Sequence, residues 1–180
     1  MNRRLVVVSG LPASGKTTTA RCLSAAMTLP LLSLDVVKES LHANLALADR
    51  ASLRAACLDV MWALLPDCPQ GAVVDLWIDP ERDVKPVRRD LARFTAMSIL
   101  EVLCIVPGAE AARRYAHRPA RTGAHLPPDD DVLARIRRSA ALIEPLGIGP
   151  ALCLDTTEPV DVAAVVGWLD RHTDAAARPT

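Results

Sequence analysis

The segment Gly10–Thr17 constrains the fold of this chain more than any other part of the sequence. It reads G-L-P-A-S-G-K-T and satisfies the pattern G-x-x-x-x-G-K-[ST] at every fixed position. The apolar run Leu5–Ser9 comes directly before it, and a helical stretch, Lys16–Met27, follows. A strand, a glycine-containing turn and a helix in this order predict a loop whose backbone N–H groups and helix N-terminus converge on a phosphate group.

The fixed positions of this loop each have a physical reason. Gly10 and Gly15 let the backbone curl so that several N–H groups point inward. Lys16 adds a mobile positive charge for the β- and γ-phosphates of a nucleoside triphosphate, and Thr17 offers a hydroxyl to Mg²⁺. We therefore expect ATP and Mg²⁺ as ligands. The nucleotide contacts predicted from this loop are Gly10, Pro12, Ala13, Ser14, Gly15, Lys16, Thr17 and Thr18.

Short apolar runs alternate with longer helical stretches along the rest of the chain, which predicts a doubly wound α/β domain. The runs are apolar on both faces, as in the buried strands of a parallel sheet. The expected strands are Leu5–Ser9, Leu31–Leu34, Ala72–Ile78, Glu101–Val106 and Ala151–Leu154. The expected helices are Lys16–Met27, Val36–Ala46, Arg50–Leu65, Val87–Ala96, Ala109–Arg118, Asp130–Leu142 and Val160–Arg171. The predicted architecture is a single-domain P-loop NTPase with a five-stranded, mostly parallel sheet flanked by helices and a small lid that carries arginines.

The domain is expected over residues 1–172, with a disordered tail over residues 173–180. Hydrophobic residues make up 51% of the chain, which argues against disorder of the whole. The formal net charge is zero, so no global basic field would collect nucleic acid. No apolar run approaches the roughly 20 residues that a membrane span needs, so we expect a cytoplasmic protein with no membrane partner. The oligomeric state stays open.

Missing motifs narrow the class of phosphate-loop protein. A GTPase needs D-x-x-G and N-K-x-D, and neither occurs; the only asparagines are Asn2 and Asn44. The L-S-G-G-Q signature of transporter ATPases is also missing. A compact kinase, with a core, an acceptor pocket and a small lid, remains.

Four motifs give the chain a resemblance to the small P-loop kinases of the zeta-toxin-like, chloramphenicol-phosphotransferase-like and polynucleotide-5′-kinase-like branch. They are Gly10–Thr18, Ser33–Leu41 (S-L-D-V-V-K-E-S-L), Val73–Asp75 (V-V-D) and Arg114–His125 (R-Y-A-H-R-P-A-R-T-G-A-H). From their order and spacing, the resemblance covers most of the chain, roughly residues 4–156. The first motif is highly specific, whereas kinases with different acceptors share the others. The resemblance implies a lid over about residues 114–128.

Asp35 follows the second expected strand, where ligands bind in an open parallel sheet. The resemblance implies that this carboxylate accepts the proton of the substrate hydroxyl. The alternative is a helix N-cap, because Asp followed by V-V-K-E begins a helix well. Both roles can hold together.

Asp75 ends the core of the third expected strand, where an unpaired carboxylate is costly to bury. A Mg²⁺-bound water is a natural partner, so we expect Asp75 and Thr17 to serve the metal. The alternative is a hydrogen bond from a neighbouring turn. Asp79 is the weaker metal candidate, because Pro80 after it makes a capping role sufficient.

Arginines of the expected lid are the remaining catalytic candidates. Arg114 and Arg118 are four residues apart on one expected helix and should share a face, and Arg121 follows them. The resemblance implies that they close over the triphosphate, with Arg118 and Arg121 as catalytic groups and Arg114 as a nucleotide contact. The alternative is a solvated basic face, and Arg135, Arg137 and Arg138 are interpreted as surface charge. Weaker pocket candidates are His125, His42, Asn44, Trp62 and Trp77.

The leading functional hypothesis is an ATP-dependent kinase that phosphorylates a hydroxyl of a small molecule, either a metabolite or an antibiotic. A nucleic-acid 5′-hydroxyl kinase is the alternative, disfavoured by balanced charge and scarce aromatic residues. A non-catalytic nucleotide-binding regulator would not need Asp35. A nucleoside monophosphate kinase would need a second phosphate site, for which Arg54, Arg82 and Arg88 are available but unmarked.

Overall fold

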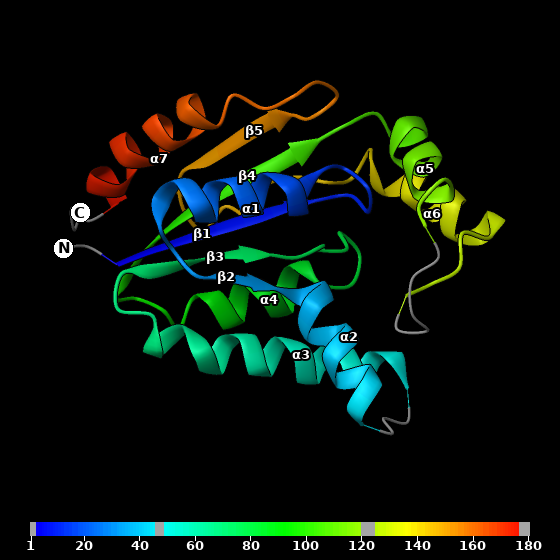
Figure 1. Ribbon diagram of the computed structural model, residues 1–180, viewed down its shortest axis with the longest axis horizontal. Coiled ribbons are helices and arrows are strands. Elements are labelled where there is room, and N and C mark those ends of the chain that lie inside the picture. Colours follow the sequence, from blue (N-terminus) through cyan, green and yellow to red (C-terminus); the bar gives the residue numbers. More distant parts are fainter. Residues whose placement is uncertain (1–2, 46–48, 120–124, 177–180) are drawn as a thin grey trace.

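In the computed structural model, which describes residues 3–45, 49–119 and 125–176, parallel strands form one five-stranded sheet in the order β2-β3-β1-β4-β5 (Figure 1). The strands are β1 (Arg3–Gly10), β2 (Leu31–Ser33), β3 (Gly71–Asp75), β4 (Met97–Ile105) and β5 (Ala151–Asp155). The helices are α1 (Lys16–Met27), α2 (Leu34–Asn44), α3 (Arg50–Leu64), α4 (Val84–Leu91), α5 (Gly108–Ala116), α6 (Asp130–Ser139) and α7 (Val162–Ala176). A short 3₁₀ turn, η1 (Leu65–Asp67), follows α3.

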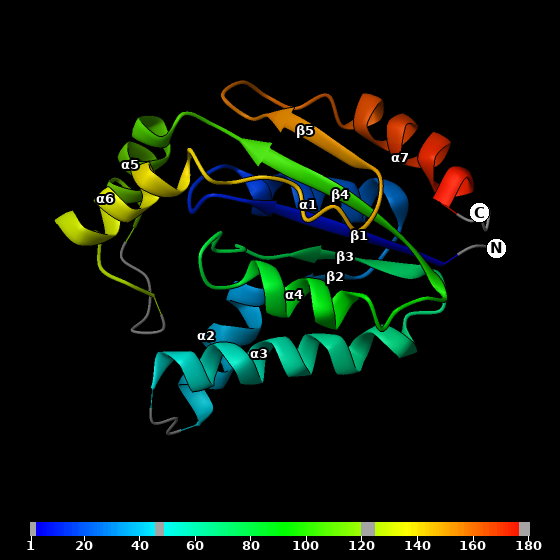
Figure 2. The ribbon, with the colours of Figure 1, turned by 180° about the vertical axis from the view of Figure 1, so that it is seen from behind.

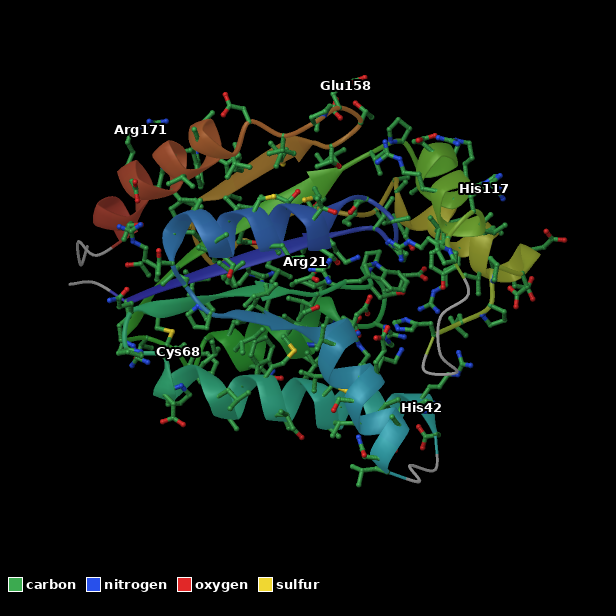
Figure 3. All side chains as sticks on the ribbon, in the orientation of Figure 1. Arg21, His42, Cys68, His117, Glu158 and Arg171 are labelled. Carbon is green, nitrogen blue, oxygen red and sulfur yellow. The ribbon has the colours of Figure 1, made fainter. Side chains whose placement is uncertain are left out.

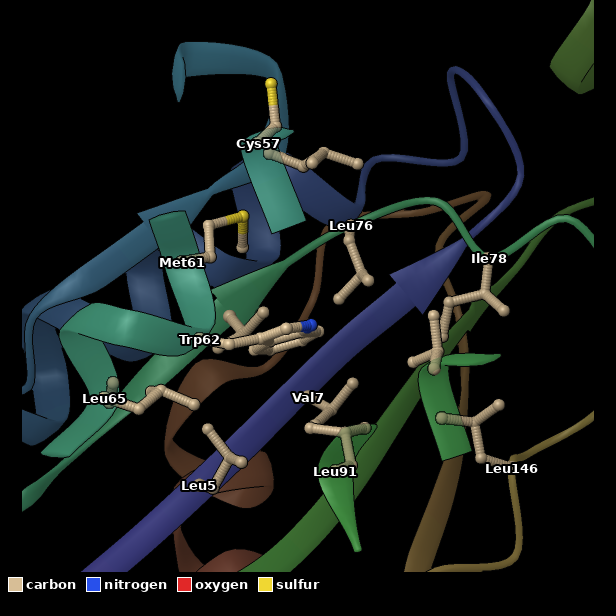
Figure 4. Close-up of a cluster of buried hydrophobic side chains, with 14 of the residues drawn as sticks. Leu5, Val7, Cys57, Met61, Trp62, Leu65, Leu76, Ile78, Leu91 and Leu146 are labelled. Carbon is tan, nitrogen blue, oxygen red and sulfur yellow. The ribbon is translucent and has the colours of Figure 1, made fainter. Parts of the chain in front are cut away.

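Alternating side chains of β1 feed two separate cores, because successive residues of a strand point to opposite faces of the sheet. Leu5 and Val7 join a cluster with residues of α3 and α4, which Figure 4 shows around Trp62 and Leu91. Val6 and Val8 join a second cluster with residues of α1 and α7. Figures 1 and 2 show these helix pairs on opposite faces of the sheet. The predicted doubly wound α/β architecture is therefore confirmed.

Helices α5 and α6 form a separate pair beyond the carboxyl ends of β1 and β4 (Figure 1). Their apolar residues, including Ala111 and Ile136, pack around Leu11 of the phosphate loop and Val106. The pair therefore stands at the edge of the sheet where the phosphate loop lies.

Three element boundaries differ from the sequence prediction for local reasons. α4 begins at Val84, ahead of Pro86, because a proline in the first helical turn needs no N–H donor. α5 ends at Ala116, since Pro119 disfavours a helical conformation at Arg118. α7 continues to Ala176 instead of ending at Arg171. Within it the buried Thr173 hydroxyl donates to the Leu169 carbonyl at 2.8 Å, so Thr173 is part of this helix.

Among the described residues, no helix combines the length and the apolar character that crossing a bilayer requires.

Candidate active site

The loop between β1 and α1 is shaped by two glycines in conformations that other residues avoid. Gly10 has φ 151° and Gly15 has φ 88°. A Cβ at residue 10 would lie 2.5 Å from Ser14 Oγ and 2.6 Å from the Cys104 carbonyl oxygen, so β4 passes too close for any side chain. Gly15 is the N-cap of α1 and leaves the first turn without a side-chain hydrogen bond. The N-terminus of α1 is thus open to an anion.

The far side of the loop is fastened to the end of β5. The Thr156 hydroxyl donates to the Ser14 carbonyl at 2.6 Å and lies 3.0 Å from the Ile105 carbonyl. The Ser14 hydroxyl is buried and makes no hydrogen bond to any residue within the described ranges. A phosphate oxygen would satisfy this group, which supports the predicted nucleotide contact.

Lys16 brings several predicted residues into one electrostatic neighbourhood. Its ammonium is buried and reaches the Leu11 carbonyl at 3.4 Å. Burial lowers the pKa of Lys16, the charges of Asp75 and Asp35 raise it, and the charge of Arg118 lowers it. The charges of both predicted carboxylates and of Arg118 therefore act on the predicted cation, Lys16.

Asp75 is the last residue of β3, and its side chain is only 2% exposed. Its Oδ2 accepts a 3.0 Å hydrogen bond from the Ser33 hydroxyl, while its Oδ1 has no partner among the described residues. A buried, unpaired carboxylate oxygen suits an oxygen-liganded cation such as Mg²⁺. The described part of the chain contains no cluster of three His, Cys, Asp or Glu side chains, so a cation would also need Thr17 and ligand oxygens.

Asp35 lies in the first turn of α2 and is not its N-cap. Ser33 occupies the N-cap position, in an extended conformation, and its hydroxyl is already directed to Asp75. The alternative interpretation of Asp35 as a helix cap is therefore wrong. Its half-buried carboxylate lines a cavity of about 100 Å³ together with Lys16 and Arg118.

Arg114 and Arg118 do not share a helix face, contrary to the prediction, because α5 ends between them. Arg114 contacts Glu110 at 2.7 Å and donates to the carbonyls of Thr156 and Thr157 at 3.1 and 3.2 Å. Arg118 instead lies over the Tyr115 ring, 5.6 Å from its centroid, and lines the cavity that contains Asp35. Arg121 falls outside the described residues.

A larger cavity of about 600 Å³ adjoins the small one, and four residues line both: Lys38, Arg54, Trp77 and Leu126. Sequence reasoning did not mark Lys38, although it lies three residues after Asp35 on α2 and therefore near the same face. Arg54 gave no local signal, because its place depends on how α3 packs. Arg88, considered with it, does not line either cavity.

Of the weaker pocket candidates, two line a described cavity and three do not. Trp77 lines both cavities, whereas Trp62 is buried in the core against Phe94. His125 lines the small cavity and contacts Glu39 at 2.8 Å. His42 lies toward the far end of α2, away from the phosphate loop (Figure 3), and neither it nor Asn44 lines a described cavity.

Asp79 has a structural role that leaves its metal candidacy weak. Its buried carboxylate accepts from the N–H groups of Glu81 and Arg82 at 3.1 and 3.2 Å, as in a turn cap. Arg135 also donates to it and lies over the Trp77 ring. The interpretation of Arg135 as surface charge is wrong, because α6 places this side chain in the wall of the 600 Å³ cavity.

A third cavity, of about 330 Å³, opens on the outer side of the phosphate loop. Thr18 and Cys22 of α1 line one side, and Pro159, Val160 and Val162 line the other. Figure 3 shows Glu158, another lining residue, on the loop after β5. The sequence carried no signal for this apolar recess.

Comparison with protein families settles the relationship suggested by these motifs. The model of the AAA domain family AAA_33 matches residues 5–143. The chain belongs to the AAA_33 family. No curated protein matches the AAA_33 chain in sequence.

Solved structures share the fold of this AAA_33 protein over nearly its whole length. A protein from Chloroflexus aurantiacus described as a candidate kinase is 26% identical, with a TM-score of 0.80 over 96% of this chain and 99% of that one. A gluconokinase from Sinorhizobium meliloti is 18% identical, with a TM-score of 0.61 over 97% and 95%. Shikimate kinase from Acinetobacter baumannii, solved with shikimate, is 14% identical, with a TM-score of 0.65 over 98% and 96%. The predicted relationship to the small P-loop kinases is confirmed.

Proposed function

We propose that this protein is an ATP-dependent phosphotransferase that moves the γ-phosphate to a hydroxyl group of a small-molecule acceptor. One observation carries the proposal: Lys16, Asp35 and Arg118 line a single small cavity that lies between the phosphate loop and a larger cavity. The larger cavity has the volume of a small-molecule site. The kinases among the structural relatives, which are named for gluconate and shikimate, agree with this class of acceptor.

The phosphate loop and the recess beside it are suited to the nucleotide. The open N-terminus of α1 and the Ser14 hydroxyl would receive phosphate oxygens. The apolar side chains of Pro159 and Val160 would cover the base in the 330 Å³ recess. Arg114 remains a predicted nucleotide contact, because it holds the backbone of Thr156 at the edge of that recess.

Thr17 and Asp75 are the residues that would hold Mg²⁺, Thr17 through its hydroxyl and Asp75 through its unpaired Oδ1 or a bound water. The bound cation would neutralise charge on the phosphate oxygens. Lys16 would contribute a second positive charge to the phosphate oxygens.

Asp35 would orient the acceptor hydroxyl and accept its proton. The acceptor oxygen would then form a bond to the γ-phosphorus as the bridging bond to the β-phosphate breaks, with ADP leaving. Arg118 would stabilise charge on the transferred group. Arg121, outside the described residues, remains a predicted second arginine of the lid.

The test is incubation with Mg²⁺-ATP and pooled acceptors, with new phosphate esters detected by mass spectrometry. The pools are sugars, sugar acids, hydroxylated antibiotics, nucleoside monophosphates and 5′-hydroxyl oligonucleotides. Lys16→Ala and Asp35→Asn should each lower the product rate at least about 100-fold, because each removes a group that acts in the transition state. Asp67→Asn, at an exposed carboxylate on η1, should leave the rate unchanged.

A phosphorylated small molecule that disappears in both site variants establishes the proposal. Product found only on oligonucleotide ends would assign the nucleic-acid alternative instead. ATP binding without product in any pool would contradict the role proposed for Asp35.

A further inference from the structure

The 600 Å³ cavity, here called the acceptor cavity, is lined mainly by positively charged residues. The chain is formally neutral, yet six basic residues line this cavity against three acidic ones. The basic residues are Lys38, Arg50, Arg54, Arg82, Arg89 and Arg135. They come from four helices and the turn before α4, so the fold and not a local run of sequence collects them.

The acidic residues of the acceptor cavity do not neutralise its inner wall. Asp83 is shared by Arg54 at 2.7 Å and Arg82 at 2.8 Å, so one carboxylate serves two guanidinium groups. Asp90 contacts Arg89 on the exposed outer part of α4. Asp59 is exposed on α3, and Arg135 is already paired with Asp79. Positive charge therefore remains at the inner wall on Lys38 and on the two arginines that share Asp83, next to the cavity that contains Asp35.

Lys38 is the clearest unmet cation of this wall. Its side chain is half-buried, and its ammonium forms no hydrogen bond or ion pair with any residue in the described ranges. Burial lowers the pKa of Lys38, Asp35 raises it, and Arg54 and Arg50 lower it. A cation that is partly desolvated beside two other cations would be stabilised by an anion from the ligand.

Arg54 lines the same two cavities as Lys38, and one of its guanidinium nitrogens has no acceptor among the described residues. Its Nε and Nη2 are occupied by Asp83 and by the Trp77 carbonyl, the latter at 2.8 Å. Its Nη1 donates to no residue that the structure describes. The Trp77 indole N–H is likewise unpaired within those residues. Lys38, Arg54 and Trp77 all line both cavities, and each has a donor without a partner among the described residues.

We propose that the phosphate acceptor is an anion, a hydroxy compound that also carries a carboxylate or phosphate group, and that Lys38 and Arg54 bind this group. The inference rests on the phosphotransferase function proposed above. Binding the anionic group at this wall would hold a neighbouring hydroxyl toward Asp35, which lies one helical turn before Lys38 on α2.

The test compares matched pairs of acceptors that differ only in charge. One arm uses hydroxy acids beside the corresponding alcohols or amides, and a second arm uses sugar phosphates beside the free sugars. In each arm wild-type protein receives Mg²⁺-ATP, and initial rates give KM and kcat for acceptor and nucleotide separately. The arm that yields product tells a carboxylate from a phosphate.

The variants separate a binding role from a structural one. Lys38→Gln should raise the KM for the anionic acceptor about tenfold or more, because a charge-assisted contact is lost, while the KM for ATP stays unchanged. Lys38→Arg should restore most of the affinity. Lys85→Gln, at an exposed lysine of α4 that does not line the cavity, should change neither constant.

The outcomes distinguish this inference from the function on which it rests. Anionic acceptors that react well while their neutral partners do not would support the inference. Equal turnover of neutral and anionic partners, or a Lys38→Gln effect that is the same for both, would overturn it and leave the phosphotransferase intact. No product in either arm would contradict the function and the inference together.

Discussion

Burial changes the pKa of two side chains at the phosphate loop, Lys16 and Cys104. Lys16 is a buried ammonium, and burial lowers its pKa more than the charges of Asp75 and Asp35 raise it. Cys104, close behind it on β4, is also buried, and burial raises the pKa of its thiol to about 11. Cys22, by contrast, is exposed on α1 and lines the recess proposed for the base.

Bound nucleotide should protect Cys22 from alkylation. In iodoacetamide at about pH 8, Cys22 and Cys153 should both react because both are exposed, while Cys104 should remain neutral and inert. Saturating Mg²⁺-ATP should slow labelling of Cys22 several-fold and leave Cys153 unaffected. Peptide mass spectrometry over time measures each rate.

The matched control for this labelling is Lys16→Ala, in which ATP should no longer protect Cys22. Equal labelling of Cys22 with and without ATP in the wild type would place the base elsewhere.

Between elements, one carboxylate fixes the geometry of the acceptor cavity. Asp83, the N-cap of α4, contacts Arg54 of α3 and Arg82 of the preceding turn, and it also accepts the Asp79 N–H at 2.9 Å. Burial opposes ionisation of Asp83, but the hydrogen bond from Arg82 and the charge of Arg54 outweigh it and lower its pKa. The ionised form therefore holds α3 and α4 together.

Asp83→Asn should destabilise the protein by about 3 kcal/mol at neutral pH, because it leaves Arg54 partly buried without its partner. Since the folded pKa lies below the unfolded value of 3.8, this stabilisation is complete above about pH 4–5 and disappears as pH falls through the folded pKa. Urea unfolding of both proteins across this pH range should show the difference narrowing toward low pH.

The exposed Asp67→Asn variant serves as the control for this pH series and should match the wild type throughout. A stability difference that is constant with pH would show that the charge of Asp83 does not hold the two helices together.

At the scale of the whole molecule, the proposed nucleotide site joins distant parts of the chain. The phosphate loop extends β1, approaches β4 at Cys104 and is fastened to the end of β5 through Thr156. A ligand that tightens this loop is therefore linked to global unfolding. Ligand binding to the folded state alone stabilises it in proportion to the logarithm of ligand concentration.

Mg²⁺-ATP at about 100 times its Kd should add about 2.7 kcal/mol, which corresponds to a rise in Tm of about 5–10 °C for a chain of this size. Removing Mg²⁺ with EDTA should abolish most of the rise, and Asp75→Asn should reduce it in the same way. Differential scanning fluorimetry measures both. A shift in Asp75→Asn that remains as large and as dependent on Mg²⁺ as in the wild type would contradict the proposed metal role.

The sequence predicted what depends on neighbouring residues and missed what depends on packing. The phosphate loop and the carboxylate at the end of β3 follow from local pattern, because parallel strands place their carboxyl ends at one edge. The prediction that Arg114 and Arg118 share a helix face was wrong because of one residue, Pro119, which ends the helix between them. The wall formed by Lys38 and Arg54 could not be predicted, because it requires α2 and α3 to pack side by side.

The acceptor cavity and the recess beside the phosphate loop have no lining residue in common. The first is built from α2, α3, α4 with the segment before it, and the segment around α6, and the second from α1, the loop after β5 and the start of α7. Mutations that alter one cavity can therefore accumulate without altering contacts in the other. In evolution such a scaffold can exchange one acceptor for another through a few substitutions in the acceptor cavity while its phosphate donor stays the same.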